Sequence, residues 1–344
     1  MTIWIVGAGA IGSVIGAKLA HDDEVIFVDA WRDHVDAILE RGLTVDYPEG
    51  SINVSAPAFH LSELDRVGGH PQVVILAVKS NFTAEILEVV LPYLSDDSIV
   101  VSTQNCINED TIAALVGAKR TIGAMVRFGG ALLGPGHVSS NQRARRLVIG
   151  ELNGSLTDRL RSLATMLQPS VNAELTDNIW GHLWTKMVRN AELNAVAALT
   201  GFRTDEISSD VTARRVALTL GMETVRVALA LGMVLDPAEL YGPPESYLEP
   251  LDSSTMAVIE RGFVEQSSRG PGVKASMLQD IERDRPTEID YMNGYVVQKG
   301  GALGIPTPLN SQIVRLVKEL EAHQRKSSPT VVAEVFADLI ATVA

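Results

Sequence analysis

Cysteine is nearly absent from this chain of 344 residues, which contains only Cys106. A single cysteine excludes a disulfide within the chain and fits a reducing compartment, so we expect a cytoplasmic location. Basic residues are also few: 29 Lys and Arg stand against 42 Asp and Glu, and the formal net charge is −13. Because neutralising phosphates requires clustered cations, this balance argues against nucleic acid or an anionic membrane as a partner.

Long apolar runs and regularly spaced metal ligands are missing as well. No segment reaches about 18 uninterrupted apolar residues, so no membrane span is expected. The uncharged residues 1–17 lack the basic start of a signal peptide. The seven histidines show no metal-ligand spacing, so we predict no metal site. A chain of this length, 46% hydrophobic and 21% charged, favours two globular domains.

The most informative feature that is present is a glycine turn, Gly7-Ala8-Gly9-Ala10-Ile11-Gly12, directly after the apolar run Thr2–Val6. A helical pattern over residues 13–20 and a second apolar run, Glu24–Asp29, follow it. This strand–turn–helix–strand order predicts dinucleotide binding, with the pyrophosphate at the helix N-terminus. We expect Gly7 to permit the turn, Gly9 to admit the phosphates and Gly12 to allow close helix–strand packing. A glycine-rich turn in another kind of α/β sheet is the alternative.

The residue that ends the second strand bears on which dinucleotide binds. Asp29 lies about 20 residues beyond the glycine turn, where a carboxylate hydrogen-bonds the ribose hydroxyls of NAD and repels the 2′-phosphate of NADP. Arg32 follows shortly and could pair with that phosphate instead. We therefore favour NAD and keep NADP open. Asp29 could also cap the helix that follows it, and both roles could coexist.

The first half of the chain alternates short apolar runs with helical patterns, which is typical of a parallel sheet. Strands are predicted at 72–78, 98–102 and 120–126, helices at 31–41, 82–94 and 110–116, and a glycine-rich hairpin at 129–137 leading into 146–149. After residue 175 only helical patterns remain, at 178–199, 211–231, 253–268, 274–282, 288–299, 309–323 and 330–343. The predicted fold is α/β, with a Rossmann-type dinucleotide-binding domain over residues 1–175 and an all-helical domain over residues 176–344.

Lys186 lies in a predicted helix that is apolar around most of its circumference. At about 100° per residue, Lys186, Asn190 and Asn194 fall on one stripe that they share with apolar side chains. The solvent-exposed face of this helix is expected to carry three other residues: Thr185, Arg189 and Glu192. Desolvation destabilises a buried ammonium, which suits a general acid that protonates an alkoxide as hydride reaches a carbonyl carbon. A lysine that extends along the apolar surface into solvent is the alternative.

Glu288 is a second candidate, at the start of the predicted helix 288–299. Thr287 and Glu288 also have the character of helix-cap residues, so a structural role is the alternative.

Several motifs occur in order along most of the chain. They are the glycine turn, Ala77-Val78-Lys79, Gln104-Asn105, Trp184-Thr185-Lys186-Met187-Val188-Arg189-Asn190, Ser276-Met277-Leu278-Gln279-Asp280, Thr287-Glu288-Ile289-Asp290-Tyr291-Met292-Asn293-Gly294 and Gly304-Ile305-Pro306-Thr307-Pro308. On these motifs the chain resembles the ketopantoate reductases, also called 2-dehydropantoate 2-reductases.

The resemblance implies an NAD(P)H-dependent reduction of a 2-keto acid to a D-type 2-hydroxy acid, first of all ketopantoate to pantoate in pantothenate biosynthesis. It implies a cofactor in the cleft between a Rossmann domain and a helical domain, with Lys186 as proton donor and Glu288 positioning cofactor and substrate. Asn105 would lie near both the nicotinamide and the substrate, and Lys79 near the cofactor. The residues implied to hold the substrate's carboxylate or hydroxyl are Asn190, Asn194 and Ser276.

The chain departs from the family pattern at several places. Asp29-Ala30 stands where the family has a basic residue for NADP, and Thr204 stands near the place of a substrate-binding asparagine. Residues 129–146 and 228–272 are longer than in compact members. These departures favour a second hypothesis, an NAD-dependent dehydrogenase of another branched or aromatic 2-hydroxy acid, of the D-mandelate type. A third is a dinucleotide-sensing protein without chemistry, which would need neither Lys186 nor Glu288.

Three further features have open interpretations. Arg127 could pair with a substrate carboxylate, or it is an exposed loop arginine. Cys106 has no basic neighbour in sequence, so we assign it to packing. The last two predicted helices are amphipathic, so they bury against each other or against a second subunit in a homodimer.

Overall fold

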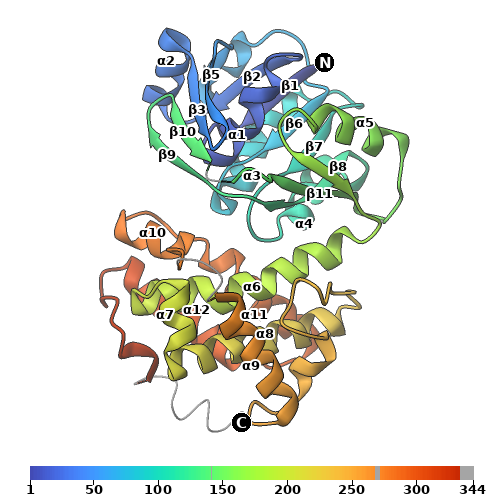
Figure 1. Cartoon of the computed structure of the whole chain (residues 1–344). Helices are drawn as coiled ribbons and strands as arrows, with labels where there is room; N and C mark the ends of the chain where they lie inside the picture. The colour runs from blue at the N-terminus through green and yellow to red at the C-terminus, as the bar shows by residue number, and fades with distance from the viewer. Residues whose placement is uncertain (141, 268–271, 334–344) are drawn as a thin grey trace. The chain divides into compact units, whose positions relative to one another are not determined.

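The computed structural model of the chain describes residues 1–140, 142–267 and 272–333. Its contacts divide the chain into two compact units, Met1–Trp180 (unit 1) and Gly181–Ala344 (unit 2). The change of character at residue 175 lies a few residues before this division. Unit 1 combines a sheet with helices and unit 2 is helical, so the predicted fold class is confirmed (Figure 1). Among the residues described, no helix combines the length and apolar character that crossing a bilayer requires.

An eight-stranded sheet forms the centre of unit 1, in the order β12-β11-β8-β7-β6-β1-β2-β5. The strands are β1 (Thr2–Val6), β2 (Glu24–Asp29), β5 (Ala58–His60), β6 (Val73–Leu76), β7 (Ile99–Ser102), β8 (Thr121–Arg127), β11 (Arg146–Glu151) and β12 (Asn172–Leu175). The six strands from β5 to β8 are parallel, and β11 runs antiparallel to β8. Their order is that of the doubly wound nucleotide-binding sheet, with its switch point between β1 and β6.

Two apolar clusters lie on the two faces of this sheet, because successive strand residues point to opposite sides. In β1, Ile3 and Ile5 belong to one cluster, whereas Trp4 and Val6 belong to the other. The first cluster is covered by α1 (Ala10–Leu19), α2 (Arg32–Arg41) and α5 (Asp158–Leu167), and the second by α3 (Thr83–Val90) and α4 (Glu109–Val116). Both faces of the sheet are therefore covered by helices and shielded from solvent, which explains why the strands are apolar throughout.

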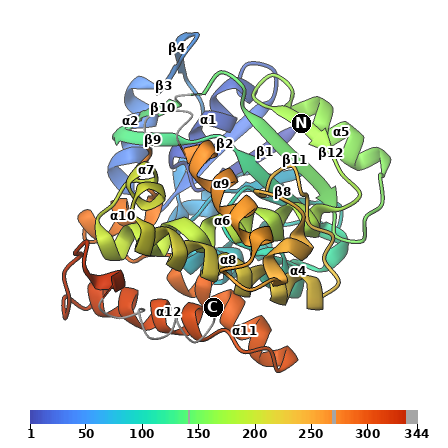
Figure 2. The same cartoon turned by 60° about the horizontal axis from the view of Figure 1, so that its bottom comes forward.

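A second, four-stranded sheet packs against α1 and was not predicted as a sheet. It consists of β3 (Leu43–Tyr47), β4 (Gly50–Val54), β9 (Gly130–Gly134) and β10 (His137–Ser140), which lie beside α1 in Figure 2. The predicted hairpin from 129–137 into 146–149 is wrong: β9 pairs with β10, and β11 pairs with β8 and β12. The turn at Gly136, whose φ is +68°, closes the hairpin earlier than the sequence pattern suggested.

Unit 2 is built from helices around the long helix α6. They are α6 (Ile179–Thr200), α7 (Thr204–Ser209), α8 (Val211–Ala230), α9 (Ser254–Ser267), α10 (Ser276–Glu282), α11 (Asn293–Leu303) and α12 (Pro308–Glu321). Most predicted helices are confirmed to within a few residues. Helix 288–299 instead starts with the 3₁₀ turn η6 (Ile289–Tyr291), and α5 and α7 were not predicted. The predicted helix 330–343 lies almost wholly outside the described residues.

A buried carboxylate joins α8 to the start of α12. Glu223 accepts hydrogen bonds from the backbone N–H groups of Leu309 (3.0 Å) and Asn310 (2.9 Å) and from the Asn310 side chain (2.8 Å). Asn310 in turn accepts from the Asn293 amide on α11 at 2.8 Å. Because the first N–H groups of a helix lack partners within it, the Glu223 carboxylate satisfies donors that would otherwise be buried alone.

A second buried carboxylate, Glu192 on α6, is less well satisfied. Its exposed fraction is 0%, and among the described residues neither carboxylate oxygen has a hydrogen-bond partner. The Nε atom of Arg189 lies 3.5 Å away. Burial raises the pKa of Glu192 to about 8, and the charge of Arg189 opposes this only in part. The predicted solvent exposure is therefore wrong for Glu192, and also for Thr185, which is 2% exposed.

The raised pKa makes stability depend on pH in a defined direction. A carboxyl group whose pKa is higher in the folded state than the unfolded value of 4.5 stabilises the fold below that value, and the contribution is lost as pH rises through about 8. Glu192→Gln, which resembles the protonated acid, should therefore raise the melting temperature more at about pH 9 than at about pH 5. Thermal denaturation at both pH values measures this. Glu88→Gln, at an exposed position on α3, is the control and should show no such difference. A Glu192→Gln effect that is equal at the two pH values would contradict the assignment.

Candidate active site

The residues predicted to bind the cofactor all lie where parallel strands of unit 1 end. Gly7 follows β1, Asp29 ends β2, and Lys79 and Asn105 lie shortly after β6 and β7. These four strands are adjacent in the sheet, so their carboxyl ends share one edge. A Cβ atom on Gly7 would lie 2.8 Å from the backbone of Ala77 and Val78, so the glycine turn touches the end of β6 directly.

The three glycines of the turn have different structural requirements. Gly7 has φ +94°, a conformation that favours glycine. A Cβ atom on Gly12 would overlap the Gly7 carbonyl oxygen and lie 2.9 Å from Ile5, so α1 packs against β1 at this point. Gly9 differs: its φ is −67°, and a Cβ atom there would meet nothing within 4 Å. No contact with the described residues therefore requires glycine at position 9. The space beside Gly9 is open and could admit a ligand.

Asp29 and Arg32 have separate partners after β2. The Asp29 carboxylate accepts the N–H of Trp31 at 2.8 Å, just before α2, and Asp29 is half-buried. The Arg32 guanidinium donates to Glu63 at 2.8 Å and thereby lowers the pKa of the Glu63 carboxyl. Glu63 also pairs with Arg66. Arg32 is thus engaged by a carboxylate, whereas Asp29 is bonded to backbone.

The loop that carries Asn105 is held by buried polar side chains that no sequence motif indicated. The Asn105 carbonyl accepts from Asn108 Nδ2 (2.8 Å) and Ser80 Oγ (3.2 Å), and Thr83 Oγ1 donates to Asn108 Oδ1 at 3.1 Å. Cys106 is buried with φ +65°, which is unusual for a side-chain-bearing residue. The hydrogen bonds found for Asn105 among the described residues are those of its backbone carbonyl.

Glu109, the first residue of α4, is a titratable group next to this loop. It is 1% exposed and accepts the N–H of Asn108 at 2.9 Å. Burial raises the pKa of Glu109 to about 7, although hydrogen bonds from the backbone oppose the shift. Residues 104–110, five of which are polar, follow a buried strand in the sequence, but only the fold shows that most of them are buried.

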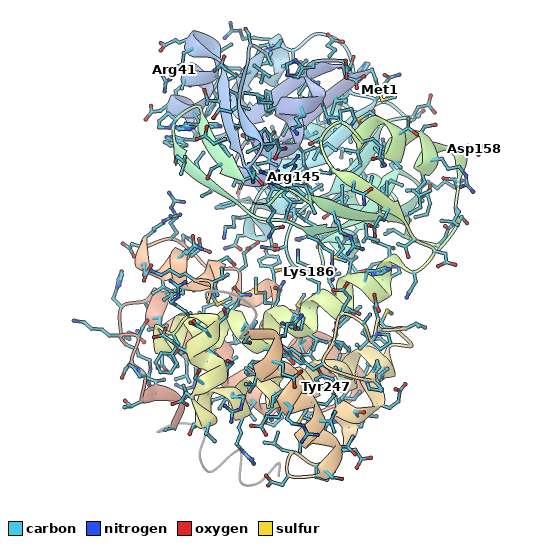
Figure 3. All side chains as sticks on the ribbon, viewed as in Figure 1. Met1, Arg41, Arg145, Asp158, Lys186 and Tyr247 are labelled. Carbon is cyan, nitrogen blue, oxygen red and sulfur yellow. The ribbon has the colours of Figure 1, made fainter. Side chains whose placement is uncertain are left out.

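In unit 2 the predicted substrate residues come together on α6 and α10. Asn194 is 7% exposed, and its side-chain oxygen accepts from Ser276 Oγ at 3.0 Å and from the Met277 N–H at 3.4 Å. Its amide nitrogen donates to the Asn190 carbonyl at 3.3 Å. Lys186 lies one turn before Asn190 on the same face of α6, is half-buried, and is labelled in Figure 3. Asn190 and Asn194, predicted from one helical stripe, and Ser276, predicted from a distant motif, thus form one polar cluster beside the lysine.

Glu288 is buried, with an exposed fraction of 3%, and its side chain makes no helix-cap hydrogen bond. Its segment is held against α12: Thr287 donates from its N–H (2.8 Å) and its hydroxyl (2.6 Å) to Glu321. The Glu288 carbonyl accepts the N–H groups of Tyr291 and Met292 at 3.0 Å. Glu288 therefore occupies a fixed backbone position within unit 2.

Arg127 is not a loop residue: it ends β8, opposite Arg146 of β11, and is half-buried. Thr204 exchanges backbone and hydroxyl hydrogen bonds with Val273, which joins α7 to the segment before α10. Arg189 lies 4.1 Å from the ring centre of Tyr241, so the loop over residues 231–253 is packed onto α6. Among described residues, no group of three or more metal-ligating side chains converges.

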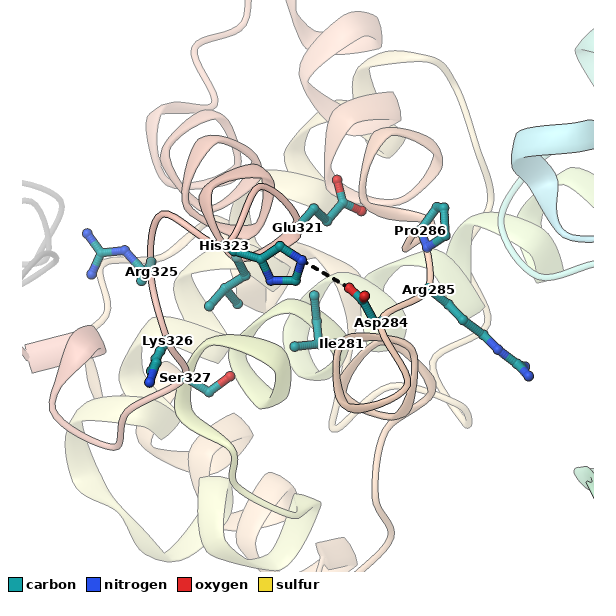
Figure 4. Close-up of a pocket in the computed structure, with 10 residues that line it drawn as sticks. Ile281, Asp284, Arg285, Pro286, Glu321, His323, Arg325, Lys326 and Ser327 are labelled. Carbon is teal, nitrogen blue, oxygen red and sulfur yellow. Dashed lines mark ion pairs between the residues drawn. The ribbon is translucent and has the colours of Figure 1, made fainter.

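A cavity of about 420 Å³ in unit 2 is separate from these residues. Figure 4 shows it between the ends of α10 and α12, where His323 and Asp284 form an ion pair at 3.2 Å. Arg285 and Glu321 also line it, but none of the predicted site residues does. The cavity therefore does not mark the candidate active site.

Sequence comparison matches both units to one family. Residues 3–154 match the family described as "Ketopantoate reductase PanE/ApbA", and residues 178–321 match "Ketopantoate reductase PanE/ApbA C terminal". A protein of Pyrococcus horikoshii named 2-dehydropantoate 2-reductase is 30% identical over 323 residues, covering 94% of this chain and 98% of its own. A protein of Mesorhizobium japonicum with the same name is 28% identical over 351 residues, covering 94% and 99%.

Structure comparison finds similar chains in two kinds of enzyme. A D-mandelate dehydrogenase, solved with NADH and anilino(oxo)acetate, superposes with a TM-score of 0.81 at 27% identity, covering 94% of this chain and 99% of its own. A PanE/ApbA family ketopantoate reductase from Ralstonia eutropha superposes with a TM-score of 0.80 at 30% identity, with the same coverage.

The contrast between Gly9 and Gly12 generates a testable prediction. Gly9→Ala should keep the melting temperature within about 2 °C of wild type, because the new Cβ meets no protein atom. It should nevertheless weaken NADH binding by about tenfold or more, since the Cβ occupies the space through which backbone would approach the phosphates. Gly12→Ala should instead destabilise the fold by about 2 kcal/mol or more through overpacking. Calorimetry and fluorescence titration measure both quantities, and wild-type NADH affinity in Gly9→Ala would refute the prediction.

Proposed function

The chain belongs to the ketopantoate reductase family, and we propose that it reduces a 2-keto acid to a D-type 2-hydroxy acid, with ketopantoate as the leading candidate. As a member of that family it is an oxidoreductase that uses a nicotinamide cofactor. The observation that carries the substrate proposal is the cluster of Asn190, Asn194 and Ser276 beside Lys186. Amide and hydroxyl groups of this kind orient a small polar acid, and a lysine neutralises the charge that develops on its oxygen.

Unit 1 has the features that a dinucleotide needs. The space above Gly9 is open, and α1 begins there with its N-terminal N–H groups and the positive end of its dipole. Gly7–Gly12, with Ala8, Ala10 and Ile11 between the glycines, would hold the pyrophosphate. Asp29 would bind the ribose, and Lys79 and Asn105 would lie along the remainder of the cofactor.

The proposed chemistry divides between the cofactor and the chain. When bound, the reduced nicotinamide supplies the hydride. Lys186 supplies the proton from Nζ to the carbonyl oxygen as that oxygen becomes an alkoxide. The cluster of Asn190, Asn194 and Ser276 holds the carboxylate or hydroxyl of the acid. Asn105 contacts both the nicotinamide and the substrate. Glu288 positions cofactor and substrate from a backbone held by Thr287 and Glu321.

We favour NAD over NADP as the cofactor. Asp29 ends β2, where a carboxylate accepts hydrogen bonds from both ribose hydroxyls and repels a 2′-phosphate. Arg32, the cation that could have bound that phosphate, donates to Glu63 instead. The similar D-mandelate dehydrogenase structure contains NADH, which is consistent with this preference.

A second candidate is a dehydrogenase of another branched or aromatic 2-hydroxy acid. It is favoured by the similarity to D-mandelate dehydrogenase and by Thr204, which stands near the place of a substrate-binding asparagine and is bonded to Val273. The cytoplasmic location and a homodimer stay predictions.

A substrate panel tests the proposed function. Purified protein is assayed with ketopantoate, a branched 2-keto acid and benzoylformate, each with NADH and with NADPH, by following the nicotinamide absorbance. The highest kcat/KM is expected for ketopantoate with NADH. A higher kcat/KM for benzoylformate or the branched acid would replace ketopantoate by the second candidate. Cofactor binding without turnover of any keto acid would indicate a dinucleotide sensor.

Lys186→Ala tests the proton donor. Loss of a general acid should lower kcat by about 100-fold or more, while the dissociation constant of NADH stays within about twofold of wild type. Lys119→Ala, which removes an exposed lysine of unit 1, is the matched control and should leave both values unchanged. Full turnover by Lys186→Ala would remove this lysine from the mechanism.

A further inference from the structure

His34, the only buried histidine among the residues described, joins the glycine turn to the β9–β10 hairpin. It lies on α2 and is 1% exposed. Its Nε2 atom lies 2.7 Å from the Ala8 carbonyl oxygen, and its Nδ1 atom lies 2.9 Å from the backbone nitrogen of Gly136. Three segments far apart in the sequence thus meet at one imidazole ring.

The two partners define the state of the ring. The Ala8 carbonyl can only accept, so Nε2 carries a hydrogen, and the Gly136 N–H can only donate, so Nδ1 carries a lone pair. Only the neutral ring with hydrogen on Nε2 satisfies both. Burial lowers the pKa of His34, which favours this neutral form, although the charge of Asp29 and the bond to Ala8 act in the opposite direction. The ring is also stacked on Trp31, with 5.6 Å between centres and 7° between planes.

The Ala8 carbonyl fixes the orientation of the Ala8–Gly9 peptide in the glycine turn. It accepts a second hydrogen bond from Ser13 Oγ at 2.6 Å, so two buried donors hold it on the inner side. The Ala8–Gly9 peptide is trans, and in a trans peptide the C=O and the following N–H point to opposite sides. Holding the Ala8 carbonyl toward Ser13 and His34 therefore turns the Gly9 N–H to the side opposite these two donors. Among described residues, the Gly9 N–H has no hydrogen-bond acceptor.

We propose that His34 is a positioning residue for cofactor binding, which holds the Ala8–Gly9 peptide so that the Gly9 N–H is presented to the pyrophosphate. This inference rests on the proposed binding of a nicotinamide dinucleotide at the glycine turn. His34 itself does not touch the ligand in this account. It acts through the Ala8 carbonyl, so its removal changes the orientation of one peptide plane and leaves the other site residues in place.

The hairpin supports the ring from the other side. The β9–β10 turn is fixed by Arg41, which donates to the Pro135 carbonyl at 2.8 Å, and by Thr44, whose N–H donates to the Gly136 carbonyl at 2.9 Å. The Gly136 N–H then holds Nδ1 and so sets the ring's rotation. A hairpin that lies in the longer region 129–146 is thereby connected through His34 to the Ala8–Gly9 peptide, which would meet the phosphates.

Two substitutions separate the two hydrogen bonds of the ring. Glutamine places an amide near Nε2 and keeps a donor for Ala8, whereas asparagine places an oxygen near Nδ1 and keeps an acceptor for Gly136. His34→Gln should bind NADH within about threefold of wild type, and His34→Asn should bind it about tenfold more weakly, the loss of one hydrogen bond to the turn. The KM of the keto acid should change in neither. Fluorescence titration of NADH and steady-state kinetics measure these values.

Tyr47→Phe is the control for a merely structural role. It removes a buried hydrogen bond to α1, the helix that follows the glycine turn, from Tyr47 Oη to the Val14 carbonyl at 2.9 Å, without touching Ala8. It should lower the melting temperature and leave NADH affinity unchanged. Ser13→Ala removes the other donor to Ala8 and should weaken NADH as His34→Asn does, which keeps the proposal testable if a His34 variant fails to fold.

The outcomes distinguish this inference from the function on which it rests. If wild-type protein binds neither NADH nor NADPH, the proposed function fails. If wild type binds NADH and both His34→Asn and Ser13→Ala bind it equally well, the positioning role is overturned and the proposed function stands. Equal weakening in His34→Gln and His34→Asn, without weakening in Ser13→Ala, would also overturn it, because the bond to Ala8 would then not be the cause.

Discussion

The close approach of α1 to β1 is the constraint on which unit 1 depends. A side chain on Gly12 would overlap the Gly7 carbonyl, and one on Gly7 would strike the end of β6. With neither present, α1 starts directly at the edge where β1, β2, β6 and β7 end, so its free N–H groups lie beside the loops that follow those strands. Asp29, Lys79 and Asn105 reach this edge because the strands before them are in register.

Buried polar groups then orient what the strands bring together. The Ala8 carbonyl is held by Ser13 and His34, and the Asn105 carbonyl is held by Asn108 and Ser80. In both loops a backbone carbonyl is held by two side-chain donors, and in the glycine turn the N–H that follows this carbonyl, that of Gly9, has no acceptor among the residues described. Buried polar atoms are costly when unpaired, so each such network has one low-energy arrangement, and the network around Ala8 sets the direction of the Gly9 N–H.

Unit 2 shows how far burial can depart from helical pattern. The apolar character of α6 and the common stripe of Lys186, Asn190 and Asn194 were predictable from 3.6-residue spacing. The solvent-exposed face was not, because Glu192 and Thr185 are covered by segments that lie far along the chain. Gly221 of α8 faces Glu192, and the backbone N–H of Asp236 donates to the Thr185 hydroxyl. A helix surrounded on most sides has no face that its own sequence marks as outer.

The sequence by itself determined the strands and helices with strong periodicity, the glycine turn and the residue types of the candidate site, since these depend on local spacing and local backbone conformation. Only the tertiary structure decided that β9 pairs with β10, that Asn194 and Ser276 share a hydrogen bond, and that His34 joins Ala8 to Gly136. The physical reason is that strand pairing and buried hydrogen bonds join groups that can lie more than a hundred residues apart. Their geometry follows from how whole layers pack, which no local pattern encodes.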